Sequence, residues 1–162
     1  MGEPEWLDER ELETWESFLA AGTLLNRRIE QQLKDDAGLS HPQYEVLVRL
    51  DRAHDGELRM TELAGAALTS KSGLSYQVAQ LEKAGLVRRR SCATDVRGVV
   101  ATITDEGRAK LRSAAPGHVT LVRELFLGGL TSRQFDGLAD GVGALVERLR
   151  APAIQPRDVD IT

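Results

Sequence analysis

One stretch of the chain combines an apolar helix face with a polar face suited to hydrogen bonding. When successive residues are rotated by about 100°, Leu74 and Leu81 fall within about 60° of Val78 and form the buried side of a helix that ends at Gly85. The opposite side and its flanks carry hydroxyl and amide groups and no carboxylate: Ser72, Ser75, Tyr76, Gln77 and Gln80. Such groups exchange hydrogen bonds with the edges of base pairs, and a face without carboxylates does not repel phosphates. This face is a candidate for contacting bases in a DNA groove, although each residue alone is also typical of a solvated surface.

Basic side chains adjoin this face on both sides. A lysine precedes it and a run of three arginines follows it, and we expect these cations to bind phosphates. Arg97 falls at the tip of a predicted hairpin, where a guanidinium can enter the negative minor groove, and Asp95 is placed to hold it by a charge-assisted hydrogen bond. The predicted DNA-binding set is Ser70, Lys71, Ser72, Ser75, Tyr76, Gln77, Gln80, Arg88, Arg89, Arg90, Asp95 and Arg97.

The overall charge argues against DNA binding until its distribution is considered. The 162 residues carry a net charge of −4, whereas nucleic-acid-binding domains are usually basic. Seven acidic residues fall within the first 16 positions, opposed there by Arg10 alone. Residues 70–98 carry six bases and two acids. The acidic excess therefore lies at the N-terminus, and the candidate contact region is locally basic.

A long helix is predicted near the N-terminus, over residues 8–36, with its end at Gly38. Its apolar residues recur at three- and four-residue spacing, and no proline interrupts them. Because this apolar stripe is longer than a compact domain needs to cover itself, we expect part of it to contact a partner.

Two shorter helices precede the polar helix. The first begins after Ser40, whose side chain is expected to form a capping box with Gln43, and it runs to about Arg52. The second is expected to be capped by Thr61 and to extend over residues 62–67.

The hydrophobic period changes after the polar helix. Residues 86–90 and 99–103 are β-prone runs joined by a polar segment, which predicts a hairpin. Two helices separated by a short break and followed at once by a hairpin are typical of a winged helix-turn-helix. The predicted fold class is therefore mainly α with a small β-hairpin wing.

The C-terminal part is predicted to be helical again. Thr104 caps a helix that is expected to kink or break at 116–117 and to stop at 128–129. Thr131 and Gln134 form a second capping box. The last helix is expected to pack an apolar stripe made of Leu138, Val142, Leu145, Val146 and Leu149.

Four blocks of sequence resemble the MarR family of bacterial transcriptional regulators. They are MTELA at 60–64, LEKAGLVRR at 81–89, DVRG at 95–98 and TDEG at 104–107. The resemblance covers most of the chain, and the spacing between the blocks is similar to that of the family. It implies a homodimer whose polar helices enter the major grooves of a pseudo-palindromic operator while the wings reach the minor groove. Many members are repressors released by small, often aromatic, acids that bind between the dimerisation helices and the winged domain.

This resemblance also implies a division of the chain and a set of candidate ligand contacts. The expected parts are an N-terminal dimerisation helix (1–38), a winged helix-turn-helix domain (39–104), C-terminal dimerisation helices (105–150) and a flexible tail (151–162). Trp15 and Tyr44 could stack on an aromatic effector and His118 could line its pocket, although such residues are also typical of a core or a solvated surface. The peroxide-sensing branch of the family has a reactive cysteine in the first helix; this chain has none there, so we interpret Cys92 as a packing residue.

Several other functions are disfavoured by composition. A single cysteine excludes an internal disulfide, three scattered histidines disfavour a metal site, and no cofactor is predicted. No nucleophile–base pair or phosphate-binding glycine loop is present, so an enzyme is not expected. No apolar run approaches the ~18 residues of a membrane span, and the acidic N-terminus is unlike a signal peptide, which predicts a cytoplasmic protein. The alternative function is a winged helix used for protein contacts without sequence-specific DNA binding.

Overall fold

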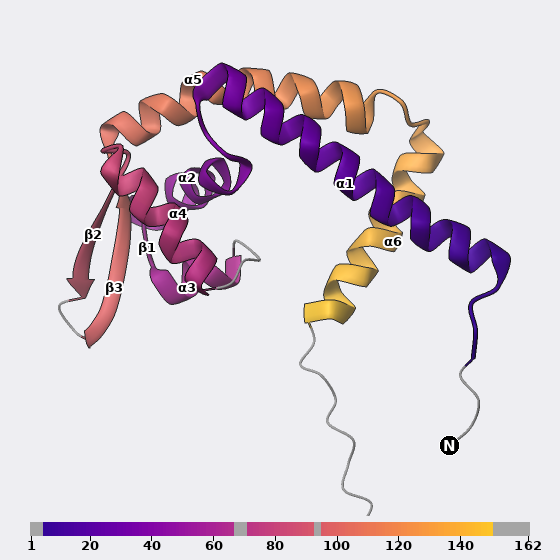
Figure 1. The fold of residues 1–162 in the computed structure, drawn as a ribbon, viewed down its shortest axis with the longest axis horizontal. Coiled ribbons are helices and arrows are strands. Elements are labelled where there is room, and N and C mark those ends of the chain that lie inside the picture. Colours follow the sequence, from indigo (N-terminus) through magenta and orange to yellow (C-terminus); the bar gives the residue numbers. More distant parts are fainter. Residues whose placement is uncertain (1–4, 67–70, 93–94, 151–162) are drawn as a thin grey trace, which may run out of the picture.

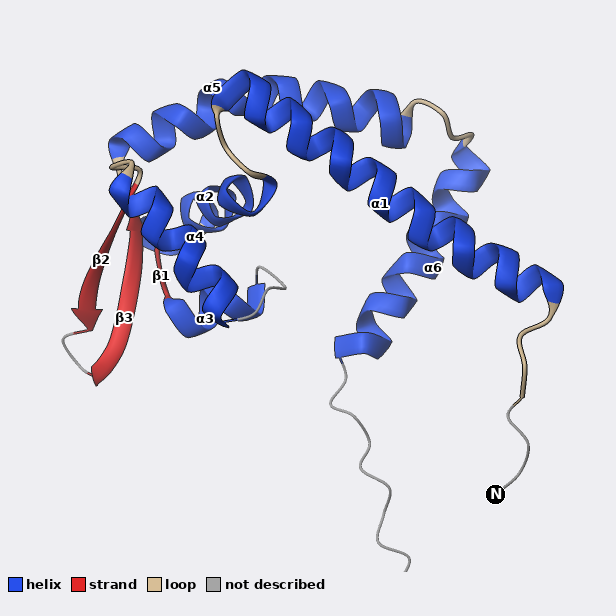
Figure 2. Cartoon of the chain, viewed as in Figure 1, coloured by secondary structure: helices blue, strands red, loops and turns tan. Residues whose placement is uncertain are grey.

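The computed structural model describes residues 5–66, 71–92 and 95–150 of the chain. A winged domain lies at one end, helices α1 and α5 run alongside each other above it, and α6 passes behind α1 in this view (Figure 1). The elements are α1 (Glu9–Ala37), α2 (His41–Arg52), a 3-10 turn (His54–Gly56), β1 (Glu57–Arg59), α3 (Met60–Ala66), α4 (Lys71–Lys83), β2 (Val87–Cys92), β3 (Asp95–Ile103), α5 (Asp105–Val122), a π-helical turn (Arg123–Leu127) and α6 (Ser132–Arg150). Figure 2 shows that helices predominate and that the strands gather in one small sheet, which confirms the predicted fold class.

Most helix boundaries agree with the capping signals in the sequence. Gly38 ends α1 in a left-handed conformation with φ 63°. Ser40 and Gln43 form both hydrogen bonds of the predicted capping box, at 3.3 and 3.0 Å. The Thr104 hydroxyl accepts a hydrogen bond from the Gly107 amide at 3.0 Å, and a capping box before α6 is present as predicted. These signals act over three or four residues, so the sequence alone is sufficient to place them.

The start of α3 differs from the prediction. The helix begins at Met60, so Thr61 lies inside it and does not cap it. Its N-terminus is satisfied in another way, because the Glu62 carboxylate accepts a hydrogen bond from the Arg59 amide at 3.0 Å. Glu62 therefore supplies the reciprocal half of a capping box.

A third strand was not predicted. β1 pairs with β3 in antiparallel register, Glu57 opposite Thr102 and Arg59 opposite Val100, and gives the sheet order β1-β3-β2. The hairpin strands β2 and β3 are also longer than predicted, with β2 extending to Cys92 and β3 beginning at Asp95. A strand of three residues is too short for an alternating pattern to be recognised.

The predicted break at Pro116–Gly117 is wrong, because α5 continues through both residues to Val122. Packing against α1 accounts for this continuity. A Cβ atom on Gly117 would lie 2.6 Å from Asp36 Oδ2 and 2.9 Å from Gln32 Nε2, so the glycine permits close approach of the two helices. Tertiary contacts of this kind outweigh the missing backbone donor of proline. The irregularity occurs later, in the π-helical turn at 123–127.

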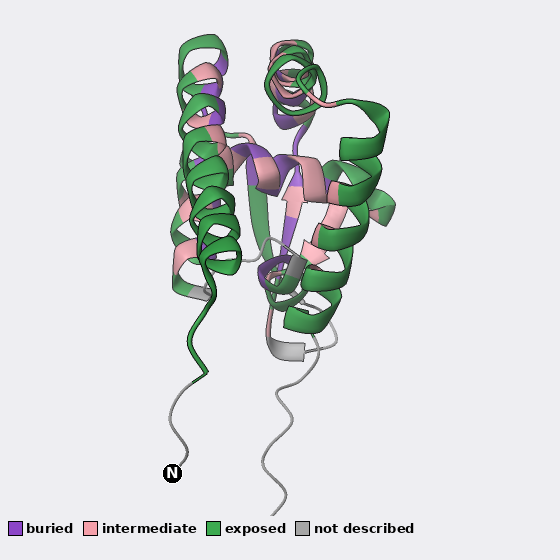
Figure 3. Ribbon diagram, turned by 90° about the vertical axis from the view of Figure 1, so that its right-hand side faces the viewer, coloured by how far each residue is buried: buried purple, intermediate pink, exposed green. Residues whose placement is uncertain are grey.

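The core lies in the winged domain and extends into α1. Leu47, Leu50, Leu63, Leu74 and Val78 are essentially inaccessible to solvent. From α1 the core receives residues of the last third of the helix, Ile29, Leu33 and Ala37. The first half of α1 and all of α6 are exposed or partly exposed in the single chain (Figure 3). The apolar stripe predicted for the last helix therefore has no cover within the described part of this chain.

Candidate nucleic-acid interface

The α4 helix presents its two faces as the sequence predicts. Leu74, Val78 and Leu81 are buried against the winged-domain core. Ser72, Ser75, Tyr76 and Gln80 are exposed and Gln77 is partly exposed. The Tyr76 side chain is notable because 61% of it remains accessible, although an aromatic ring of this size would ordinarily be used for packing. This helix therefore offers a continuous polar face to a ligand outside the chain.

Some predicted contact residues are only partly described. Ser70 lies outside the described residues, just before α4. The backbone of Lys71 belongs to α4, and the backbones of Asp95 and Arg97 belong to β3; the side chains of these three lie outside the description. Cys92 ends β2, and its side chain is likewise outside the description. The backbone of Arg97 is thus the third residue of β3, close to the start of that strand at Asp95.

The three consecutive arginines of β2 are exposed but differ in their surroundings. They pair with Thr102, Ala101 and Val100 of β3 in turn, so Arg88 and Arg90 project from one face of the sheet and Arg89 from the other. Arg90 Nη2 lies 2.8 and 2.9 Å from the carboxylate oxygens of Glu57 on β1. Arg89 binds the Glu82 carboxylate of α4. Both pairings join residues from different elements, and no local sequence signal predicts them.

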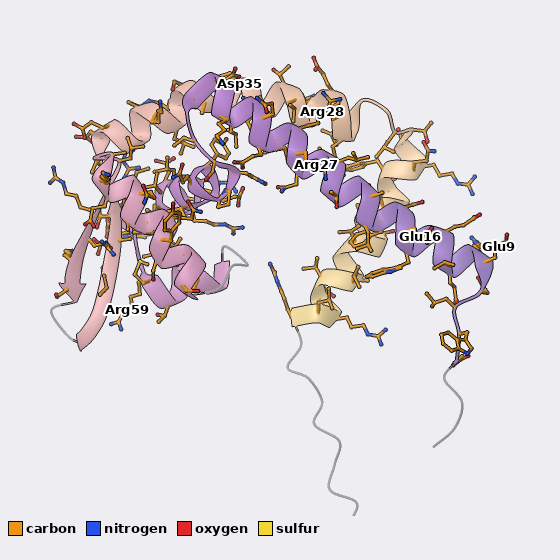
Figure 4. All side chains as sticks on the ribbon, in the orientation of Figure 1. Glu9, Glu16, Arg27, Arg28, Asp35 and Arg59 are labelled. Atoms are coloured by element: carbon orange, nitrogen blue, oxygen red, sulfur yellow. The ribbon has the colours of Figure 1, made fainter. Side chains whose placement is uncertain are left out.

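The charge separation seen in the sequence is also a separation in space. Glu9 and Glu16 lie on the outer half of α1, at the opposite end of the molecule from Arg59 in the winged domain (Figure 4). The acidic N-terminal segment therefore does not face the polar surface of α4. The acidic excess and the locally basic contact region therefore occupy different parts of the molecule.

Two of the three candidate ligand residues lie together. The rings of Tyr44 on α2 and His118 on α5 have centroids 4.7 Å apart, and the His41 ring lies 6.3 Å from that of His118. His41 Nδ1 is 2.8 Å from Asn26 Oδ1 on α1. This group marks the junction of α1, α2 and α5. Trp15 is not part of it, because it lies on the outer half of α1 and stacks on Phe18 at 6.4 Å.

His118 is the histidine most affected by its surroundings. Burial lowers its pKa, the charge of neighbouring His41 lowers it further, and Glu45 opposes the shift. Its Nδ1 atom is buried and has no hydrogen-bond partner among the described residues. The neutral ring is therefore favoured in the folded chain.

We expect the free energy of unfolding to decrease as the pH falls below about 6.5, the ordinary histidine pKa, because the unfolded chain then binds a proton that folded His118 resists. The substitution His118→Gln should flatten this part of the pH profile, measured by urea unfolding at a series of pH values. His54→Gln is the control for the loss of one imidazole, since the His54 side chain is 95% exposed. Identical profiles for wild type and His118→Gln would contradict this assignment.

Within residues 5–66, 71–92 and 95–150 no group of three histidine, cysteine or acidic side chains is arranged to hold a metal ion. None of the described helices is long and apolar enough to cross a membrane.

Comparisons with known proteins point in one direction. A model of the MarR family matches residues 37–98. The chain is 44% identical to Sco3205, a MarR family transcriptional regulator from Streptomyces coelicolor solved in complex with DNA, with a TM-score of 0.89 over 93% of this chain and 94% of that one. It is 34% identical over 107 residues to the transcriptional regulator HosA of Escherichia coli, covering 66% of this chain and 75% of HosA. It is 28% identical over 143 residues to the transcriptional repressor YetL of Bacillus subtilis, covering 88% of this chain and 84% of YetL.

Proposed function

Because the chain belongs to the MarR family of transcriptional regulators, we propose that it binds a pseudo-palindromic operator as a homodimer and represses transcription. The observation that carries this proposal is the exposed, carboxylate-free face of α4 beside the hairpin wing. The DNA complex of Sco3205 supports it, since that protein shares both the fold and 44% of the sequence. The repressor assignment is supported by the name of YetL.

Each part of the interface has a proposed role. The polar face of α4 reads base edges in the major groove, where hydroxyl and amide groups match the donors and acceptors. Arg97 enters the minor groove, with Asp95 orienting it. Phosphate contacts come from Ser70, Lys71 and Arg88, whose side chain has no hydrogen bond or ion pair with any residue that the structure describes. Arg89 and Arg90 are each bound by a carboxylate of the chain.

Dimerisation is proposed through α1, the π-helical turn and α6. These elements enclose an open apolar groove of about 710 Å³, lined by Phe18, Leu25, Phe126, Phe135, Leu138 and Val142, among others. Single-chain proteins rarely leave so much contiguous apolar surface in water, so a second copy is the proposed cover. In this proposal residues 1–38 and 105–150 supply the interface and residues 39–104 the DNA contacts.

A small aromatic or acidic effector is proposed to bind where α1, α2 and α5 meet. Tyr44 and His118 offer ring faces there, and the unsatisfied Nδ1 atom of His118 is suited to a polar group of the ligand. Trp15 lies too far along α1 to share this position, and in a dimer it would belong to the subunit interface instead.

The test of this proposal is a comparison of binding to two duplexes, the DNA upstream of the gene itself and a random sequence of equal length. A regulator should prefer its own site by about 10³-fold or more. If the dimer neutralises about eight phosphates, log K against log salt should have a slope near −7. A winged helix used only for protein contacts would show neither specificity nor this slope.

The wing makes a separate contribution that one substitution can measure. Arg97→Ala should weaken operator binding by about tenfold, because an arginine in a narrow minor groove responds to its strong negative potential. The melting temperature should change little, since the residue lies at a hairpin tip. Titration of labelled operator and thermal unfolding measure the two effects, and an unchanged operator affinity would refute the wing assignment.

A further inference from the structure

The Glu82–Arg89 pair joins the recognition helix to the wing. Arg89 Nε donates to Glu82 Oε2 at 2.8 Å, and its Nη2 binds the same oxygen. The Arg89 backbone amide donates to the other carboxylate oxygen, Oε1, at 3.0 Å. Glu82 lies in the last turn of α4 and Arg89 in the middle of β2. One carboxylate thus binds both the side chain and the main chain of the wing strand.

The main-chain contact has a structural consequence for the wing. β2 is an edge strand, since the sheet order is β1-β3-β2. The Arg89 amide therefore points away from β3, and Glu82 satisfies a donor that an edge strand would leave open. The carboxylate acts as an anchor for the sheet edge on the α4 side.

Other contacts hold the base of the wing, at the turn between α4 and β2. Gly85, in a left-handed conformation with φ 74°, turns the chain from α4 into β2. The Leu86 amide donates to the Leu81 carbonyl at 2.9 Å, and the Thr104 hydroxyl donates to the Gly85 carbonyl at 2.8 Å. The Glu82–Arg89 pair lies beyond this turn and ties the middle of β2 to the last turn of α4.

The pair also lies at the junction of the two DNA-contacting surfaces. Arg89 lines a cleft of about 270 Å³ together with Ser75 of α4 and Val99 of β3. A duplex that α4 contacts in one groove and the wing contacts in the next would pass over this cleft. Because Glu82 neutralises the Arg89 guanidinium and uses its Nε–Nη2 edge, that edge is not available to a phosphate while the pair is intact.

We propose that Arg89 is a positioning residue, which together with Glu82 holds the wing at the angle to α4 that lets both reach the DNA at once. This inference rests on the proposed function for its effect on operator binding. It changes the role expected for Arg89 from the sequence, where it was assigned to phosphate binding. Arg88 and Arg97 keep their proposed DNA contacts.

The substitution Glu82→Ala distinguishes the two roles by the sign of its effect. If Arg89 positions the wing, operator affinity should fall by about tenfold although a negative charge near the DNA has been removed. If Arg89 is a phosphate ligand held back by Glu82, the same substitution should strengthen binding. Glu106→Ala is the control, because it removes one exposed carboxylate from the first turn of α5 without touching the wing contact.

Two further measurements separate positioning from a general loss of structure. Arg97→Ala should cost less affinity in the Glu82→Ala chain than in wild type, because a wing that is no longer positioned has less contact to lose. Minor-groove protection from hydroxyl radicals should be lost while major-groove protection by α4 is kept. The inference would be overturned if Arg97→Ala cost the same affinity in the wild-type and Glu82→Ala chains and the minor-groove protection by the wing were retained.

A measurement without DNA keeps the result independent of the proposed function. Nitroxide labels at Gln80→Cys and Val99→Cys, in a Cys92→Ser chain, report the distance between α4 and the wing. The distance distribution should be narrow with Glu82 present and broader in Glu82→Ala. An unchanged distribution would refute the positioning role. Failure of the wild-type protein to prefer its own upstream DNA, with the broadening still observed, would instead refute the proposed function alone.

Discussion

Two carboxylates placed on the apolar face of α6, Leu138→Asp with Val142→Asp, should convert the proposed dimer into a monomer. Both side chains line the apolar groove between α1, the π-helical turn and α6. A buried, unpaired carboxylate opposes association by several kcal/mol, which exceeds what a single apolar contact contributes. A monomer can engage only one half of an operator, so affinity should fall by about 10²-fold or more.

Sedimentation equilibrium and operator titration measure the two consequences together. Gly143→Asp with Ala144→Asp is the matched control, because both positions are exposed and lie on the other side of α6. It adds the same charge and should leave dimer and operator affinity close to wild type. A Leu138→Asp/Val142→Asp chain that stays dimeric and binds normally would place the interface elsewhere.

Gly107→Ala, in the first turn of α5, should destabilise the fold where this helix packs against the winged domain. A Cβ atom there would lie 2.2 Å from the Leu86 carbonyl oxygen and 2.8 Å from Ile103 Cγ1. Relief of such an overlap requires α5 to move away from the turn between α4 and β2, and overpacking of this kind typically costs about 1–3 kcal/mol, occasionally more. The melting temperature should fall by several degrees, at roughly 2–4 °C per kcal/mol for a chain of this size.

Gly65→Ala provides the contrast for this measurement. No atom lies within 4 Å of the position where its Cβ would be, and it is inside α3. Alanine is favoured over glycine in a helix by about 0.5–1 kcal/mol, so this variant should be slightly stabilised. Thermal unfolding followed by circular dichroism compares the two. A Gly107→Ala chain that melts with wild type would show that α5 is not held against Leu86.

The sequence was informative where a few neighbouring residues determine the structure. Gly38 and the Ser40–Gln43 capping box determine the boundary between α1 and α2, and both could be identified from side-chain chemistry alone. The inward face of α4 could be predicted from the helical period, because this period places Leu74, Val78 and Leu81 on one side of the helix. Local signals of this kind need no knowledge of the rest of the fold.

What could not be predicted depended on residues distant in sequence. Arg90 is bound by Glu57, 33 positions earlier, and that contact requires the short strand β1 that the sequence did not reveal. The continuity of α5 through Pro116 depends on α1 packing at Gly117. Trp15 and Tyr44 are both candidate ligand contacts because both are aromatic. The helical period does not show that Trp15 lies on the outer half of α1, far from Tyr44.

The burial of the end of α1 has a consequence for exchanging specificity between relatives. Ile29, Leu33 and Ala37 belong to the core of the winged domain, although they lie in the same helix as the exposed acidic segment. In a chimera joined at residue 39, the end of α1 would come from one protein and the rest of the winged-domain core from the other. The side chains of the two parts would then not pack together. A transplanted DNA-reading module should therefore start before residue 29, so that the junction falls in the solvent-exposed part of α1 that precedes its core residues.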